Sequence, residues 1–174
     1  MILVAIGSNV AGPWGSPRQT VERALAELDR PPCRLVRASR LIMTSPMGDP
    51  DQPAFINAVA IIETALAAPQ LLDHLHNLEL EADRRRSVRW GPRTLDLDLL
   101  DHDGIIIAET DRVRTGHGLM VLPHRGIAER IFVLGPIAEI APEWRHPVSG
   151  ETAAEMLVFL GEKGAGREIA DGQV

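Results

Sequence analysis

The stretch FINAVAIIET at residues 55–64 is the clearest strand in the sequence and decides the architecture. Side chains alternate between the two faces of a strand, so the odd-numbered residues from Phe55 share one face and the even-numbered residues from Ile56 share the other. Asn57 is the one strongly polar side chain before the end of the run, and both faces are otherwise nearly apolar. We therefore expect a sheet that is covered by other elements on both faces.

Outward from this strand, hydrophobic periodicity and capping signals predict irregularly alternating strands and helices. Such an order favours the α+β class over a doubly wound parallel sheet. We expect one domain over residues 1–160 and a disordered tail over residues 161–174. The expected strands cover residues 2–7, 34–43, 55–64, 94–100 and 105–108, with a short apolar segment at 132–134. The expected helices begin after Ser16, near Pro69 and after Thr152, and the last one ends at Gly161.

Composition narrows the range of partners. The chain has 174 residues, a net charge of -6 and a single cysteine, Cys33. An acidic chain is a poor match for nucleic acid or a membrane surface, so we expect small-molecule partners. One cysteine allows no internal disulfide and suits a reducing compartment, which favours the cytoplasm. In the absence of a heptad or a long apolar patch, we expect a monomer.

The stretch RWGPRTLDLDLL at residues 89–100 places two aspartates, Asp96 and Asp98, two positions apart in a predicted strand. Their Cα atoms would then lie roughly 7 Å apart on one face, within reach of one divalent ion or a pair of ions. The alternating leucines would bury the other face. Taken alone, the pair is equally consistent with an edge strand that has a solvated acidic face.

An arginine cluster precedes and enters this stretch, and it favours an anion as ligand. Guanidinium groups bind phosphate oxygens in pairs, so arginines beside two carboxylates could hold a magnesium triphosphate from both sides. The alternative is a solvated basic loop. Glu79 could pair with the cluster or position one of its arginines. The cluster consists of Arg84, Arg85, Arg86, Arg89 and Arg93.

Aromatic residues are scarce, so their positions carry weight. Phe55 precedes Asn57 on the same strand face, and an aromatic ring beside an amide suits a flat heterocycle that is rich in nitrogen. Phe132 could cover the second face of such a ring, although ordinary core packing is the alternative for both phenylalanines. His124 is the best placed histidine, with a capping or core role as its alternative. The only lysine, Lys163, is in the tail, so there is no Walker A lysine.

Together these motifs resemble the hydroxymethyldihydropterin pyrophosphokinase family, with a match that runs from about residue 2 to residue 160. The motifs that carry the resemblance, in order, are AIGSN (5–9), TSPMGDPDQPAFINAV (44–59), RWGPRTLDLDLL (89–100), Pro123-His124, Arg130 with Phe132, and EIAP (139–142).

The resemblance implies a ferredoxin-like α/β/α sandwich with a mostly antiparallel sheet. It also implies transfer of the β,γ-diphosphate of ATP to the hydroxymethyl group of 6-hydroxymethyl-7,8-dihydropterin, with release of AMP. Two Mg²⁺ ions would be held by Asp96 and Asp98, which would act with Arg84, Arg86 and Arg93 in catalysis. The family pattern places Glu79, Arg84, Arg86, Trp90, Arg93, His124 and Arg130 at the ATP site, and Gly7, Thr44, Ser45, Met47, Phe55, Asn57 and Phe132 at the pterin site.

The chain departs from the family pattern before Pro123. An arginine and a hydroxyl residue are frequent there, whereas this chain has Leu119 and Val121. The candidates to replace them lie in a longer segment and are Arg112, Arg114 and Thr115. Smaller departures are Ser45 for proline, Phe55 for tyrosine and Asp83 for glycine.

Two other functions remain open from the sequence. The first is a non-catalytic module that binds RNA or nucleotide through its arginines and exposed phenylalanines. The acidic net charge and the aspartate pair oppose it. The second is a different Mg²⁺-dependent phosphotransferase, for which Phe55 and Asn57 would have no role.

Overall fold

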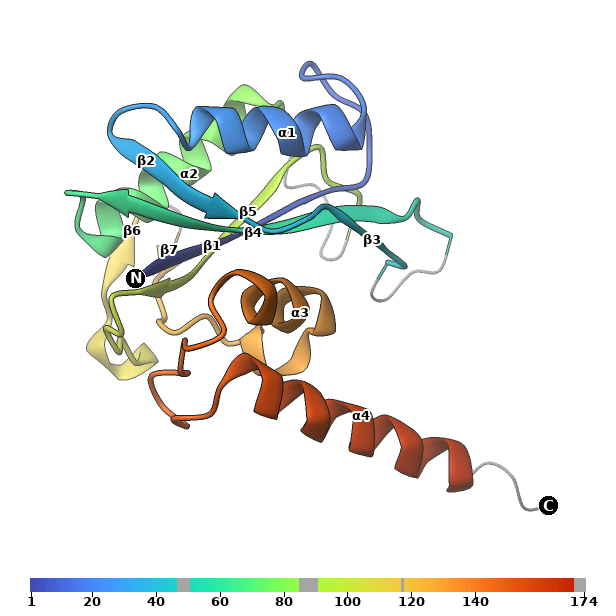
Figure 1. The fold of residues 1–174 in the computed structure, drawn as a ribbon. Helices are drawn as coiled ribbons and strands as arrows, with labels where there is room; N and C mark the ends of the chain where they lie inside the picture. The colour runs from blue at the N-terminus through green and yellow to red at the C-terminus, as the bar shows by residue number, and fades with distance from the viewer. Residues whose placement is uncertain (47–50, 85–90, 117, 171–174) are drawn as a thin grey trace.

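A mostly antiparallel sheet forms the centre of the computed structural model, which describes residues 1–46, 51–84, 91–116 and 118–170, with backbone alone for 162–170. The strand order is β2-β4-β1-β5, and β3 also pairs with β4 (Figure 1). Every one of these pairings is antiparallel. The strands are β1 (Ile2–Ser8), β2 (Cys33–Ala38), β3 (Ile42–Thr44), β4 (Phe55–Thr64) and β5 (Asp96–His102).

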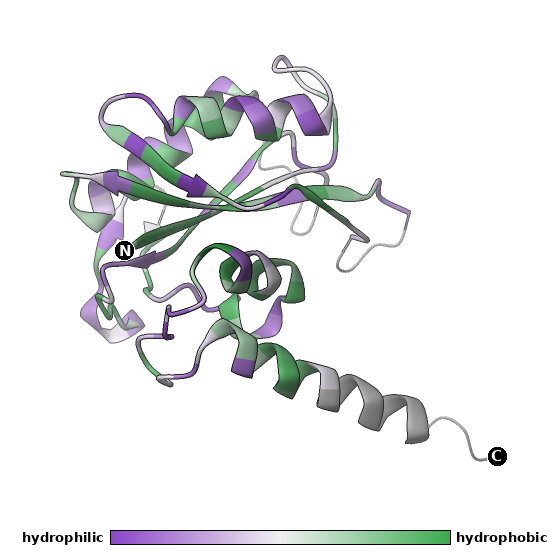
Figure 2. Ribbon diagram, in the orientation of Figure 1, coloured by the Kyte–Doolittle hydropathy of each residue, from purple (hydrophilic) through white to green (hydrophobic). Residues whose placement is uncertain are grey.

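Helices cover both faces of this sheet, as the two apolar faces of residues 55–64 predict. Helices α1 (Pro17–Glu27) and α2 (Ala68–Glu81) lie on one face, and α3 (Ile131–Ile140) and α4 (Ala153–Ala170) lie on the other (Figure 1). Even-numbered β4 residues such as Ala58 pack in the α1/α2 core, and odd-numbered residues such as Val59 pack in the α3/α4 core. The apolar colouring of Figure 2 follows these facing surfaces. The α+β class is confirmed.

Two helix starts follow the capping signals in the sequence. Ser16 caps α1 through a reciprocal pair of hydrogen bonds with Gln19, and Pro17 occupies the first turn, where its missing N–H costs nothing. Thr152 and Glu155 form the same kind of pair at the start of α4. These caps satisfy N–H groups that have no partner within the helix.

Smaller elements connect β5 to the α3/α4 layer. The hairpin of β6 (Arg114–Thr115) and β7 (Gly118–Leu119) packs beside α2. The short helices η1 (Glu109–Asp111) and η2 (Ile127–Glu129) flank it in the sequence. Among the described residues, no helix combines the length and the apolar character that a membrane crossing requires.

Three expectations about elements are wrong. The strand expected at residues 34–43 is divided into β2 and β3, and the strand expected at 105–108 is reduced to a single bridge between Ile107 and Leu122. Helix α4 continues past Gly161 because this residue does not adopt the left-handed conformation that ends helices. The division into a domain over 1–160 and a tail over 161–174 stays a prediction.

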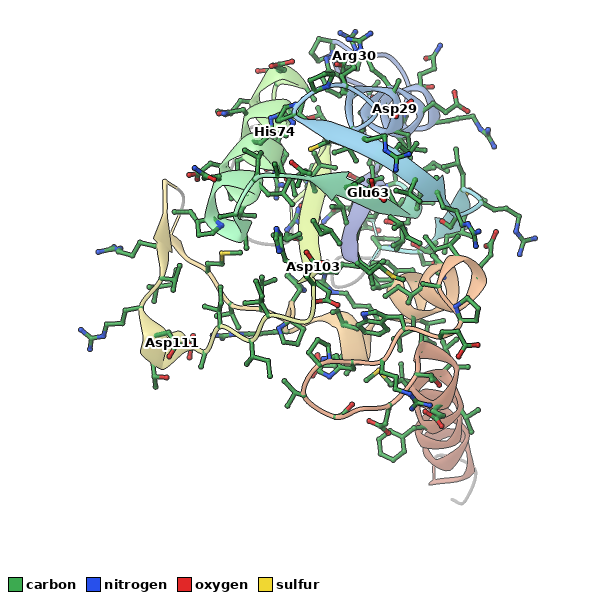
Figure 3. All side chains as sticks on the ribbon, turned by 60° about the vertical axis from the view of Figure 1, so that its left-hand side comes forward. Asp29, Arg30, Glu63, His74, Asp103 and Asp111 are labelled. Atoms are coloured by element: carbon green, nitrogen blue, oxygen red, sulfur yellow. The ribbon has the colours of Figure 1, made fainter. Side chains whose placement is uncertain are left out.

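The far end of β5 ties the sheet to both the N-terminus and the α3–α4 connection. Asp101 is 2% exposed, and its carboxylate accepts a hydrogen bond of 2.7 Å from the indole Nε1–H of Trp144. The other carboxylate oxygen accepts from the N–H of Gly104. Asp103, labelled in Figure 3, pairs with the amino group of Met1. The buried carboxylate of Asp101 thus depends on Trp144 for one of its donors.

We predict that Trp144→Phe lowers the free energy of unfolding by about 2 kcal/mol, because a buried carboxylate loses a donor. Urea unfolding measures the change. The control is Trp14→Phe, which keeps an aromatic face for the guanidinium of Arg23, 4.6 Å from the ring centre, and should cost less. Equal losses in the two variants would contradict a special role for the Trp144–Asp101 hydrogen bond.

Candidate active site

Three strands place small and polar residues side by side at one end of the sheet. In the register of the sheet, Gly7 of β1 lies between Asn57 of β4 and Asp96 of β5. Two positions back along β1, Ala5 is the register partner of Asp98. Small residues on the central strand leave space above it, so this row forms the floor of a cavity.

Asp96 and Asp98 share one face of β5, as the sequence predicts. Leu95, Leu97 and Leu99 pack in the α1/α2 core on the opposite side. The two aspartate side chains are 17% and 26% exposed, so they are not the solvated acidic face of the alternative interpretation.

The carboxylate of Asp96 is neutralised by two arginines from the arginine cluster. Arg93 donates to Oδ2, and the Nη1 atom of Arg84 lies 2.8 Å from Oδ1. Within the described part of the chain, Oδ1 is nevertheless buried without a hydrogen bond of acceptable geometry. A buried carboxylate oxygen with an unused lone pair suits coordination of a cation.

The carboxylate of Asp98 is neutralised from the α3 side of the sheet. Arg130 donates to Oδ2 at 2.9 Å, and Nε2 of His124 lies 3.7 Å from Oδ1. Nδ1 of His124 accepts from the N–H of Gly126, so in the neutral ring Nε2 carries the proton. Burial alone would raise the pKa of Asp98, but the charges of His124, Arg130 and Arg93 outweigh it and hold that pKa below its usual value.

A first cavity lies on one side of the aspartate pair and contains every described residue of the predicted pterin site. Its wall also includes Arg93, Arg130 and both aspartates. The predicted pterin residues that line it are Gly7, Thr44, Ser45, Phe55, Asn57 and Phe132, whereas Met47 lies outside the described residues.

The polar wall of the first cavity is fixed by hydrogen bonding and close packing. The side-chain amide of Asn57 donates to the hydroxyl of Thr44 at 2.8 Å and is 6% exposed. A Cβ atom on Gly7 would lie 2.9 Å from Oδ1 of Asn57, so a larger residue there would displace the amide. The hydrogen bond to Thr44 therefore fixes the orientation of the Asn57 amide, and only a small part of the amide is exposed to the cavity.

Arg130 connects the apolar wall to the acidic pair. Its guanidinium carbon lies 5.9 Å from the ring centre of Phe132 while its Nη1 contacts Asp98. A Cβ atom on Gly126 would lie 2.6 Å from Nε of Arg130, so a larger residue there would displace the guanidinium group from this position. One cation thereby contacts both the ring and the carboxylate.

A second cavity lies on the other side of Asp98. Its lining includes Asp98 and His124, together with residues from α2 and from the segment before Pro123. Of the three proposed replacements in that segment, Thr115 lines the cavity, while Arg112 and Arg114 are exposed and absent from its lining. Leu119 and Val121 also line it.

The remaining predicted site residues divide into two groups. Glu79 and Arg84 lie behind Asp96 and line neither cavity. Arg86 and Trp90 lie outside the described residues. His76 lines the second cavity, and the sequence analysis did not identify it. Its position one helical turn before Glu79 on α2 was the available signal.

Asn9 is a second residue that the sequence analysis used only as part of a motif. It is 2% exposed, and its side-chain oxygen accepts from the N–H of Arg93 at 2.7 Å. Its amide nitrogen donates to Oε1 of Gln52 and to the carbonyl oxygen of Pro53. One side chain therefore joins the segment before β4 to the segment before β5.

Arginines hold the two carboxylates in place. The first cavity beside them contains two phenylalanines and an amide, and the second cavity shares Asp98 with the first. Together these features define the site of an enzyme that transfers a phosphate-containing group. The chain matches the family model described as 7,8-dihydro-6-hydroxymethylpterin-pyrophosphokinase over residues 3–142. The chain belongs to this family.

Three curated relatives match this chain over 84% to 96% of their own lengths, and each of the three is named 2-amino-4-hydroxy-6-hydroxymethyldihydropteridine pyrophosphokinase. The relative from Pseudomonas aeruginosa is 42% identical over 157 residues, which cover 90% of this chain and 89% of that protein. The relative from Methylorubrum extorquens is 37% identical over 164 residues, with coverages of 94% and 96%. The relative from Haemophilus influenzae is 38% identical over 146 residues, 84% of each chain.

We predict that Arg130→Gln raises the pKa of Asp98, because one of the charges that stabilise its ionised form is lost. A carboxylate with a lowered folded-state pKa stabilises the fold above its unfolded pKa of about 3.9 and loses that contribution as the pH falls through the folded value. In the variant this acid-sensitive contribution should be smaller.

Carbon-13 NMR titration of the Asp98 carboxyl group measures the shift. The control is Arg125→Gln, because Arg125 lies in the same segment but pairs with Glu109. An unchanged Asp98 titration in Arg130→Gln would show that Arg130 does not stabilise this carboxylate in solution.

Proposed function

We propose that this chain transfers the β,γ-diphosphate of ATP to the hydroxymethyl group of 6-hydroxymethyl-7,8-dihydropterin and releases AMP, as a step of folate biosynthesis. The supporting observation is the position of Asp96 and Asp98 on the wall of a first cavity, with Asp98 also on the wall of the second. An acceptor in one cavity and a donor in the other would meet at these carboxylates. Family membership supports the same reaction.

In this proposal the pterin occupies the first cavity. The amide of Asn57 offers a donor and an acceptor to the edge of the ring, and Phe55 and Phe132 stack on its faces. Thr44, Ser45 and Met47 complete the pocket, the last from outside the described residues. Such a pocket orients the hydroxymethyl group toward the aspartates, and orientation is a large part of what this kind of transfer requires.

ATP occupies the second cavity, with its phosphates directed toward the aspartate pair. The adenosine lies against residues such as His76 and Thr115, and Thr115 supplies the hydroxyl that Val121 lacks. His124 and the guanidinium groups of Arg84, Arg93 and Arg130 bind phosphate oxygens. Arg86 and Trp90 belong to the same predicted set, whereas Glu79, also predicted at the ATP site, lines neither cavity.

Mg²⁺ fits the acidic pair, and two ions with ATP are part of the proposal. The buried Oδ1 of Asp96 has no well-formed hydrogen bond in the described region, and Asp98 is ionised at neutral pH because of its low pKa. When bound, Mg²⁺ would supply charge neutralisation and polarisation of the phosphates. Asp96 and Asp98 would hold it, while the arginines bind and orient the phosphates. The low pKa makes Asp98 a weak base for the alcohol.

We also infer that the fold is ferredoxin-like. Its supporting feature is the pair of split β-α-β units, β1-α1-β2 and β4-α2-β5, in a sheet of order β2-β4-β1-β5. A monomer with no nucleic-acid or membrane partner is proposed for the same chain. The net charge of -6 opposes RNA binding, which would weaken steeply with salt and need no Mg²⁺.

The proposal is tested by mixing the protein with ATP, Mg²⁺ and 6-hydroxymethyl-7,8-dihydropterin. The expected products are AMP and the pterin diphosphate. ADP as the product would indicate transfer of a single phosphoryl group and overturn the proposal. No reaction with this acceptor, alongside reaction with another, would favour a different Mg²⁺-dependent phosphotransferase.

We predict that Asp96→Asn and Asp98→Asn each lower turnover about a thousandfold or more, which corresponds to ~4 kcal/mol of transition-state stabilisation. Each change removes a negative charge that Mg²⁺ requires. The initial rate of AMP release measures the loss. Asp103→Asn is the control because Asp103 follows the same strand but pairs with the N-terminus. Near-normal turnover in both site variants would contradict the proposal that Asp96 and Asp98 bind Mg²⁺.

We predict that Asn57→Ala abolishes measurable pterin binding while the affinity for ATP stays within about twofold. The pterin edge loses its donor and acceptor, and a polar ligand whose partner is missing binds poorly. Titration calorimetry with each ligand separates the two effects. The control is Asn77→Ala, because Asn77 is exposed on α2. Unchanged pterin affinity would favour the rival phosphotransferase.

A further inference from the structure

Glu79 carries a carboxylate that is buried behind the aspartate pair. It lies near the C-terminal end of α2 and is 2% exposed. An ionised carboxylate in such a place is strongly destabilised unless charged or polar partners surround it. Two of its partners belong to different parts of the site, the backbone of β5 and the guanidinium of Arg84.

The first partner is the backbone between the two aspartates. Leu97 donates its N–H to Oε1 of Glu79 at 2.7 Å. Because β5 is the last strand in the order β2-β4-β1-β5, strand pairing engages it along β1 only. The carboxylate of Glu79 takes the place of a neighbouring strand at this N–H. It therefore helps to fix the backbone that carries Asp96 and Asp98.

The second partner is the arginine that also contacts Asp96. The Nη1 atom of Arg84 donates to Oε1 of Glu79 and lies 2.8 Å from Oδ1 of Asp96. Arg84 is 12% exposed at its side chain, so it has little freedom to move. It is held between a fully buried carboxylate and one that faces the cavity.

We propose that Glu79 is a positioning residue for diphosphate transfer and not a ligand of ATP. This proposal rests on the function proposed above. Glu79 holds the guanidinium of Arg84 beside Asp96, so that Arg84 stays in place when a cation occupies Asp96. A guanidinium group has five N–H donors, and those not used by Glu79 are then available for phosphate oxygens.

The charge of Glu79 matters because it changes the competition for Asp96. Arg84 contacts the carboxylates of both Glu79 and Asp96. When Glu79 is neutral, Asp96 is the one negatively charged partner of the two. Arg84 then competes with Mg²⁺ for the same carboxylate oxygen. A purely structural role, in which Glu79 only accepts from Leu97 and fills space, would survive replacement by the isosteric glutamine.

The test is a double-mutant cycle with Glu79→Gln and Arg84→Gln. The probe is the Mg²⁺ complex of α,β-methylene ATP, which cannot undergo the transfer, and titration calorimetry measures its dissociation constant. We expect Glu79→Gln to raise this constant about tenfold, the lower range for a lost charge-assisted hydrogen bond. In the Arg84→Gln background the same change should alter it less than about twofold, since Arg84 transmits the effect.

An equal effect of Glu79→Gln in both backgrounds, or no effect in the wild-type background, would overturn the proposal. The matched control is Glu22→Gln, because Glu22 forms an exposed ion pair with Arg18 on α1. If Glu79→Gln is too unstable to purify, Glu79→Ala, which also removes the charge, takes its place in the cycle with the same two outcomes. Failure of the proposed function is distinct, because it appears as the absence of AMP from the wild-type protein.

Discussion

The structure depends on compensation of the two negative charges that β5 carries on one face. At about 7 Å and an effective dielectric constant near 20, two carboxylates repel by roughly 2 kcal/mol. Guanidinium groups from three separate segments offset this repulsion: Arg84 follows α2, Arg93 precedes β5 and Arg130 precedes α3. These ion pairs therefore fix the relative positions of segments that are far apart in the sequence.

The two hydrophobic cores explain where this charged site can exist. Along most of its length the sheet is buried on both faces, and β1 and β4 supply apolar residues to each core. At one end the α3 face is interrupted by a row of three register partners, Asn57, Gly7 and Asp96. Polar side chains replace apolar packing there, and the cavity opens at that point. The position of the site is thus a property of sheet register.

Periodicity and capping in the sequence were sufficient for the α+β class and for a sheet that helices cover on both faces, because residues 55–64, Ser16 and Thr152 act through local rules. Spacing likewise placed Asp96 and Asp98 on one face. The sequence could not show that Arg84 is shared between Glu79 and Asp96, since that contact depends on the packing of α2 against β5. The contribution of His76 was missed for the same reason. Its one signal in the sequence was its position a single helical turn before Glu79 on α2.

The hydrogen bonds of Asn9 have a consequence for cooperativity. Its side-chain oxygen accepts a hydrogen bond from the backbone N–H of Arg93, near the acidic pair. Its side-chain nitrogen donates to Gln52 and Pro53, near the Phe55 end of β4. Neither segment can move away from β1 without breaking bonds made by this one amide. Order in the segment before β4 and order in the segment before β5 are therefore coupled through a residue that lines neither cavity.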